Sequence, residues 1–157
     1  MLAKILYPND TFFGEKVLKE KEAPSTVKGI MTTPVITTDI GNSVQDAARV
    51  MTEKRIGSIV VTKEGKPVGI ATERDILQRV VAKGLDASAV KMRTIMSQPL
   101  ITVDEKIPIL QAIRIMEKNK ARRLLVVKND KLVGIATQRD LLRALVFHVL
   151  ISFRPLL

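Results

Sequence analysis

Hydrophobic positions along the chain follow two spacings, one typical of helices and one typical of strands. After Ser43, apolar residues at positions 44, 47, 48 and 51 recur at helical spacing, so one face of this helix should be buried, with Ser43 as its N-cap. The runs 57–62 and 67–71 are apolar and β-branched, and predict two strands joined by a turn. A helix over residues 73–83 should follow, because Gly84 is a usual residue just past a helix end.

The same order of elements returns 65 positions later. Residues 69–75 read Gly-Ile-Ala-Thr-Glu-Arg-Asp, and residues 134–140 read Gly-Ile-Ala-Thr-Gln-Arg-Asp. A repeat of fixed period sets the architecture. The second copy predicts an extended piece at 100–102, a helix that opens at Pro108, strands at 124–127 and 132–136, and a helix from Gln138 onward. Each unit is therefore expected to be strand–helix–strand–strand–helix, in the α/β (α+β) class.

This repeat divides the chain into four parts. Residues 1–26 form an arm outside the repeat, residues 27–88 the first unit, residues 89–146 the second, and residues 147–157 an apolar tail. A unit of roughly 60 residues is marginal alone, so the two should fold as a pair. The tail would be an exposed apolar patch on a monomer, and it should pack on the arm or across a dimer.

Composition narrows the function. Hydrophobic residues make up 46% of the chain and aromatic residues 3%, so the core must be aliphatic. No cysteine is present, which excludes disulfides and fits a cytoplasmic protein; the chain shows no signal peptide or apolar stretch long enough to span a bilayer. His148 is the one histidine, so neither a Ser–His–Asp set nor a metal site is expected, and no carboxylate pair is placed for acid–base work. An enzyme is not expected.

The net charge of +10 is unevenly placed, with +8 of it after residue 89. This excess suggests an anionic partner for the second half, or only a lysine-rich soluble surface. A nucleic-acid-associated adaptor is one alternative, although few aromatic residues are available to stack on bases. A structural dimerisation unit with empty clefts is another.

A threonine and an aspartate stand together where each second hairpin strand meets a helix. Thr72 with Asp75, and Thr137 with Asp140, have the spacing of a capping box, which stabilises a helix start by about 1 kcal/mol. The same geometry suits a nucleotide, because a helix start attracts phosphate and a carboxylate can accept hydrogen bonds from a ribose diol. The glycine three residues before each threonine would let a ligand approach the backbone closely.

The motif Gly-x-x-Thr-x-x-Asp closes each copy, and Met-Thr-Thr-Pro-Val (31–35) and Met-Ser-Gln-Pro-Leu (96–100) open them. With these motifs residues 27–146 resemble a tandem pair of CBS domains, also called a Bateman module. The resemblance implies two units packed with pseudo-twofold symmetry around two clefts that bind AMP, ADP, ATP or S-adenosylmethionine. It further implies a homodimer of such pairs and a regulatory module that acts on an effector protein in trans.

The resemblance also implies the residues of each cleft, because the aspartate of one copy holds ribose while the other copy reaches base and phosphate. One cleft would use Thr72, Asp75, Leu100, Ile101, Arg122 and Arg123. The other would use Thr137, Asp140, Ile36, Thr38, Gly57 and Ser58. Guanidinium groups bind phosphate bidentately, so the arginine-bearing cleft should prefer more phosphates, and the other AMP, adenosine-like or sulfonium ligands. A solvated strand edge is the alternative for the two arginines.

Overall fold

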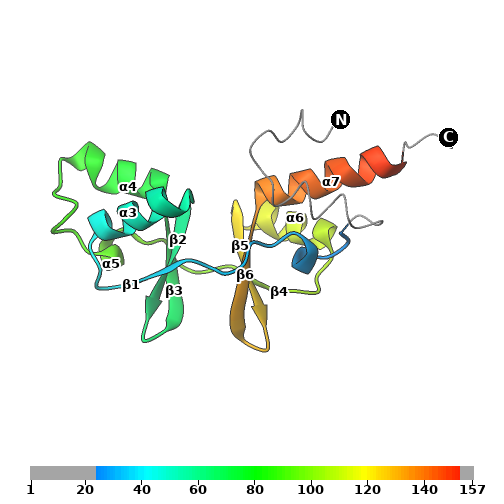
Figure 1. Ribbon diagram of the computed structural model, residues 1–157, viewed down its shortest axis with the longest axis horizontal. Helices are drawn as coiled ribbons and strands as arrows, with labels where there is room; N and C mark the ends of the chain where they lie inside the picture. The colour runs from blue at the N-terminus through cyan, green and yellow to red at the C-terminus, as the bar shows by residue number, and fades with distance from the viewer. Residues whose placement is uncertain (1–23, 153–157) are drawn as a thin grey trace.

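A computed structural model of the protein describes residues 24–152 (Figure 1). Its elements, in chain order, are η1 (Val27–Gly29), β1 (Thr37–Asp39), α3 (Val44–Lys54), β2 (Ser58–Lys63), β3 (Lys66–Thr72), α4 (Glu73–Arg79), η2 (Val81–Lys83), α5 (Met92–Ile95), β4 (Thr102–Asp104), α6 (Ile109–Lys118), β5 (Arg123–Lys128), β6 (Lys131–Thr137) and α7 (Gln138–Ser152). The hairpins β2–β3 and β5–β6 lie in the middle, with α3 and α4 outside one of them and α6 and α7 outside the other (Figure 1).

Each repeat forms a three-stranded sheet of the same topology. Strand β1 runs parallel to β2, which pairs antiparallel with β3, and β4, β5 and β6 repeat this order. The registers also repeat, since Thr37 lies opposite Val60 and Thr102 opposite Leu125. The predicted fold class, two strand–helix–strand–strand–helix units, is confirmed.

Local signals place most helix ends where the pattern predicted them. The Ser43 hydroxyl accepts a hydrogen bond from the Asp46 amide at 3.0 Å, and so caps α3. The helix expected over residues 73–83 is wrong in one respect, because α4 stops at Arg79. Val80 leaves the helical conformation and buries its side chain completely, and the 3₁₀ turn η2 then ends at Gly84, whose φ is +64°. Burial of Val80 therefore overrides helical continuity.

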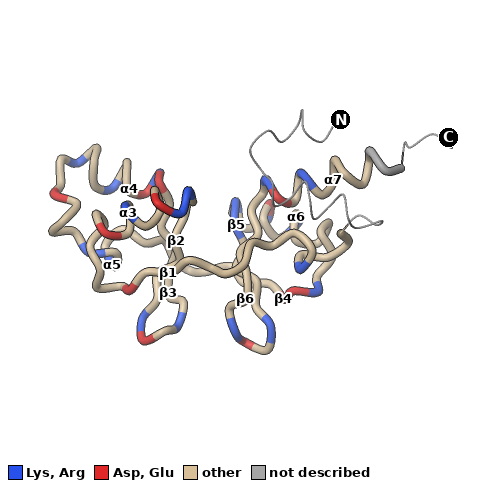
Figure 2. The backbone as a smooth tube through the Cα atoms, in the orientation of Figure 1, with Lys and Arg blue, Asp and Glu red and all other residues tan. Residues whose placement is uncertain are grey.

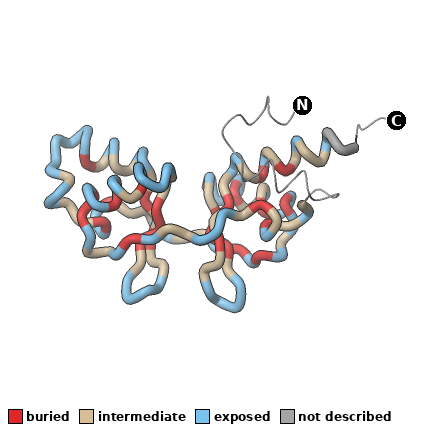
Figure 3. The backbone as a smooth tube through the Cα atoms, in the orientation of Figure 1, coloured by how far each residue is buried: buried red, intermediate tan, exposed pale blue. Residues whose placement is uncertain are grey.

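The two repeats exchange their leading segments. Met92 and Ile95 of the second repeat belong to the core of the first, and Val27 and Ile30 of the first repeat belong to the core of the second. Backbone hydrogen bonds fix both exchanges, from the Val27 amide to the Ile107 carbonyl at 3.0 Å and from the Val44 amide to the Val90 carbonyl at 2.9 Å. The buried positions accordingly form two clusters, one on each side of the molecule (Figure 3). Neither repeat has a complete core of its own.

Two methionines reinforce the exchange. Met31 packs over Gly134 and Met96 over Gly69, and a Cβ atom added at either glycine would lie 2.5 Å from the methionine sulfur. Each glycine therefore makes room for a side chain of the other repeat. The expectation that these glycines admit a ligand is wrong in this structure, because methionine side chains fill that space.

A buried acid anchors the first leading segment. Glu105 is only 4% exposed, and its Oε1 lies 3.7 Å from Lys28 Nζ and 3.4 Å from Lys128 Nζ. The Lys28 amide also donates to the Glu105 carbonyl at 2.8 Å. The contact joins the start of the first repeat to the second sheet.

The ends of the described region lie together. A ring nitrogen of His148, on α7, is 2.9 Å from the Pro24 carbonyl oxygen. No helix among residues 24–152 combines the length and apolar character required to traverse a bilayer. Most of the predicted N-terminal arm (1–23) and the last residues of the predicted tail (153–157) lie outside the described residues.

Candidate functional site

Both threonine–aspartate pairs form complete capping boxes. The Thr72 amide and hydroxyl donate to Asp75 Oδ2 at 2.9 and 2.6 Å, and the Asp75 amide donates back to Thr72 Oγ1 at 3.2 Å. The corresponding distances for Thr137 and Asp140 are 2.8, 2.6 and 3.3 Å. The capping prediction is confirmed. Because the hydrogen bonds donated by the threonine all go to Oδ2, the second carboxylate oxygen, Oδ1, remains for other partners.

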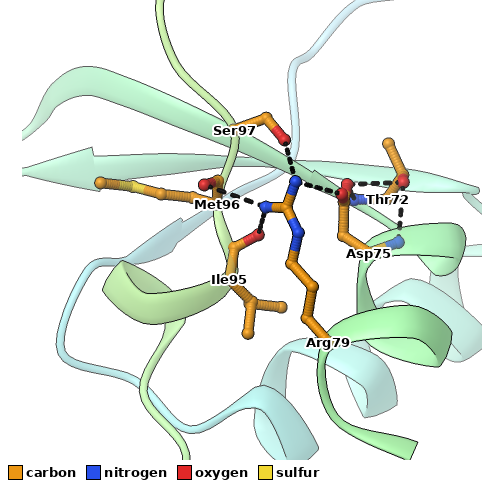
Figure 4. A network of polar contacts seen from close by, with 6 residues as sticks. All are labelled: Thr72, Asp75, Arg79, Ile95, Met96 and Ser97. Atoms are coloured by element: carbon orange, nitrogen blue, oxygen red, sulfur yellow. Dashed lines mark hydrogen bonds and ion pairs between the residues drawn. The ribbon is translucent and has the colours of Figure 1, made fainter. Parts of the chain in front are cut away.

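Arg79 takes that second oxygen in the first repeat. Its Nη2 lies 3.2 Å from Asp75 Oδ1 and donates to Ser97 Oγ at 3.1 Å, while Nη1 donates to the carbonyl oxygens of Ile95 and, at 3.3 Å, Met96 (Figure 4). In the second repeat the equivalent position is the buried Ala144. The two capping boxes therefore stand in different surroundings.

Arg123 reaches from the second repeat to the first. Its Nη2 donates to the Gly57 carbonyl at 3.4 Å. Burial lowers the pKa of Arg123, while the charges of Glu73 and Asp75 raise it and that of Arg122 lowers it. The group stays a cation, since arginine keeps its proton in proteins. The Arg123 Nε is buried and has no hydrogen-bond partner among the described residues, which leaves one donor unsatisfied beside the Asp75 capping box.

Arg122 serves a different surface. Arg122 lies just before β5, which begins at Arg123, and the two arginines have different surroundings. Arg122 is exposed, and with Gln138 and Arg139 it lines a hollow of about 650 Å³ between α6 and α7. The chain around the start of β5 is blue in Figure 2 and lies opposite the start of β2. Arg123 is the member of the pair that hydrogen-bonds to the first repeat.

The remaining predicted residues are mostly held by their own repeat. Ile36 packs on the first core and Ile101 on the second, and Leu100 is half-buried. Thr38 is 7% exposed and its hydroxyl accepts a hydrogen bond from Asn42 Nδ2 at 3.1 Å. Ser58 lies opposite Thr72 in the β2–β3 pairing, so it borders the Asp75 capping box.

Two residues at the site were not predicted from the sequence. Glu73 approaches Gly57, where an added Cβ would be 3.3 Å from Glu73 Oε2 and 3.7 Å from Arg123 Nη2. Glu73 and Arg79 both break the repeat, since residues 138 and 144 are glutamine and alanine. This difference between the two repeats was the feature of the sequence that could have identified both residues. Among the described residues, no group of three or more acidic or histidine side chains is placed to hold a metal ion.

Comparison with known proteins agrees with this architecture. The family model of the CBS domain matches twice, at residues 27–82 and 92–147. A protein of Methanopyrus kandleri is 41% identical over 111 residues, covering 69% of this chain and 57% of that protein. The CBS domain-containing protein YhcV of Bacillus subtilis is 34% identical over 117 residues, covering 74% of this chain and 83% of YhcV.

Solved structures share the fold. A conserved protein from Pyrococcus horikoshii superposes with a TM-score of 0.70 at 33% identity, covering 87% of this chain and 98% of that one. A hexameric CBS-CP12 protein from bloom-forming cyanobacteria gives 0.69 at 29% identity, covering 74% and 69%. The chain spans little more than half of two curated relatives it matches, 57% of the Methanopyrus protein and 55% of a mitochondrial CBS protein of Arabidopsis thaliana. The duplicated sheets, the paired capping boxes and the twofold family match together make this chain a member of the CBS-domain family, with two CBS domains in tandem.

Proposed function

We propose that this CBS pair is a cytoplasmic regulatory module that binds an adenine nucleotide (AMP, ADP or ATP), or S-adenosylmethionine, between its repeats and passes the bound state to an effector protein in trans. The Asp75 site consists of Thr72, Asp75 and Arg123. The Asp140 site consists of Thr137 and Asp140 with the first repeat's Ile36 and Thr38. No catalytic function is proposed.

The observation that carries the proposal is the position of Arg123. Its guanidinium comes from one repeat and lies at the capping box of the other, with a buried Nε that has no partner among the described residues. Buried donors are normally satisfied, and a phosphate oxygen is a strong acceptor for a guanidinium. A nucleotide with its phosphate on the Nη atoms of Arg123 and its ribose toward Asp75 would give this guanidinium an anionic partner.

The two sites should prefer different ligands. Arg123 favours di- and triphosphates at the Asp75 site, whereas position 58, its repeat equivalent, is a serine. The Asp140 site, without that guanidinium, should favour AMP or a sulfonium ligand. Unequal preferences of this kind would let one module compare two nucleotide concentrations.

Calorimetric titration with AMP, ADP, ATP and S-adenosylmethionine tests the proposal, using Asp75→Ala and Asp140→Ala. Each substitution should abolish binding at one site, and Asp86→Ala, an exposed loop aspartate, is the matched control. A ligand at a hundred times its dissociation constant should also stabilise the fold by about 2.7 kcal/mol. Absence of binding to every adenosyl compound at millimolar concentration would refute the sensing role and leave a structural module.

The exposed helix faces suggest how the module meets a second copy. Leu77 and Val81 after β3, and their equivalents Leu142 and Val146 on α7, are 40–60% exposed. Leu77 and Val81 border a hollow of about 210 Å³, and Leu142 borders one of about 650 Å³ between α6 and α7. Repeat-equivalent apolar side chains on one face suit a two-fold interface between copies of this chain.

A further inference from the structure

Asp75 and Asp140 have the same motif but different anchoring. In each capping box, Oδ2 accepts two hydrogen bonds from its threonine. Asp75 Oδ1 is also paired with Arg79 at 3.2 Å, whereas the residue equivalent to Arg79 in the second repeat is Ala144. A carboxylate oxygen has about two lone pairs, so Arg79 already uses one of the two that a ribose diol could take at Asp75.

Arg79 connects Asp75 to the leading segment of the second repeat. The same guanidinium that pairs with Asp75 donates to Ile95 O, Met96 O and Ser97 Oγ (Figure 4). Residues 95–97 lead from α5, which packs in the first core, toward the second sheet. Ser97 also pairs with β3, through reciprocal hydrogen bonds with Ile70 at 2.8 and 3.1 Å.

We propose that Arg79 is a positioning residue that couples the Asp75 site to residues 95–97, and that the Asp140 site has no such coupling. The ligand in this inference is the one of the proposed function. The link from Asp75 through Arg79 to residues 95–97 does not depend on that function. A ligand that takes Asp75 Oδ1 must share or displace Arg79, and so changes the hold on residues 95–97. Ala144 cannot transmit the equivalent change, because it has no polar side chain.

The chain contains an internal control. Thr32 and Ile135 exchange backbone hydrogen bonds of 2.9 and 3.1 Å at the repeat-equivalent position, where Ala144 takes the place of Arg79. Amide hydrogen exchange of Ser97 and Ile70 therefore reports the coupled side, and that of Thr32 and Ile135 reports the uncoupled side. Both pairs can be followed in one sample of the full chain.

The first experiment needs no ligand. Asp75→Asn and Arg79→Ala should each speed exchange at Ser97 and Ile70 by roughly tenfold or more, the effect of losing charge-assisted hydrogen bonds, and leave Thr32 and Ile135 unchanged. Arg79→Lys, which keeps the charge without the planar fork, should fall between wild type and Arg79→Ala. Gln78→Ala, an exposed neighbour on α4, is the control for the helix.

Thr72→Ala separates coupling from fraying of the helix. This variant removes the cap hydroxyl but keeps the Asp75–Arg79 pair, so Ser97 should exchange as in wild type. If Thr72→Ala speeds exchange as much as Asp75→Asn does, or if Asp75→Asn has no effect, the coupling is wrong. Exchange at Ser97 that stays unchanged in Arg79→Ala would also overturn it.

The second experiment adds ATP or AMP. Ligand should change exchange at Ser97 and Ile70 in wild type, and this response should disappear in Arg79→Ala even where calorimetry still shows binding. If wild type binds no nucleotide, the proposed function fails while the first experiment still decides the coupling. If wild type binds at the Asp75 site and Ser97 does not respond, the coupling fails while the proposed function stands.

Discussion

Glu73 sets the electrostatics of the Asp75 site at the scale of single residues. Its charge and that of Asp75 act on the Arg123 guanidinium, which burial partly removes from water. A phosphate that binds Arg123 must then compete with two carboxylates. The second repeat has the neutral residue Gln138 at the position equivalent to Glu73, so glutamine is compatible with the start of this helix.

Replacing Glu73 by glutamine should therefore tighten nucleotide binding at the Asp75 site. The gain should grow with the number of phosphates, reaching about 1 kcal/mol for ATP and less for AMP, because a partly exposed charge is screened. Calorimetry with both nucleotides in the Asp140→Ala background isolates the site. Equal gains for AMP and ATP, or weaker ATP binding, would contradict this account, and Glu53→Gln, an exposed residue on α3, is the control.

Sequence reasoning succeeded where the signal is local and failed where a residue depends on distant contacts. Capping at Ser43, Thr72 and Thr137 was predicted because the motif and its spacing are local. The role of Arg79 could not be, because its partners at residues 95–97 are far along the chain and its repeat equivalent is alanine. Residues that break an otherwise shared pattern are thus the ones to inspect for differences between two sites.

At the scale of elements, the exchange of leading segments is the main departure from what the pattern indicates. The segments before β1 and β4 carry apolar residues at the same positions, and either core would accept them on hydrophobicity alone. Which core each joins depends on contacts between residues distant along the chain, such as Glu105 with Lys28. Spacing along the sequence carries no information about such a choice.

Substitutions at Glu105 test how strongly its contact with Lys28 holds the first leading segment. Position 40, its repeat equivalent, is isoleucine, so Glu105→Ile should fold and should be neutral or slightly stabilising, because a well-packed apolar residue often replaces a buried charge without loss. Glu105→Ala should lower the free energy of unfolding by about 1–3 kcal/mol through the lost pairs and the space left behind. Urea denaturation measures both. A loss for isoleucine as large as that for alanine would show that the ion pairs themselves hold the segment.

For the whole molecule, the exchange means that the folding unit differs from the repeat. A fragment of residues 27–88 lacks Met92 and Ile95, whereas one of equal length, residues 36–97, contains them with the rest of the first core. The second fragment should show helical circular dichroism and a urea transition, and the first should not. The intact chain should unfold in one transition. Equal behaviour of the two fragments would mean that the leading segment contributes little to the core.

Assembly of two copies is tested through the exposed helix faces. Leu77→Glu with Leu142→Glu should convert a dimer to a monomer in light scattering, because charges on both equivalent positions oppose a two-fold contact. Leu85→Glu, also exposed but beyond η2, should leave the dimer intact. A wild-type chain that is monomeric at high concentration, or a double variant that still dimerises, would rule out this face.

The packing of Met31 on Gly134 and of Met96 on Gly69 also means that the two halves of the gene cannot evolve independently at these positions. A mutation that adds a side chain at either glycine is tolerated only if the methionine encoded in the other half shrinks with it. The duplicated halves are therefore free to drift apart in their surfaces but must change in step where they interlock. Recombination that imports a single half from a relative will succeed only when the donor carries matching partners.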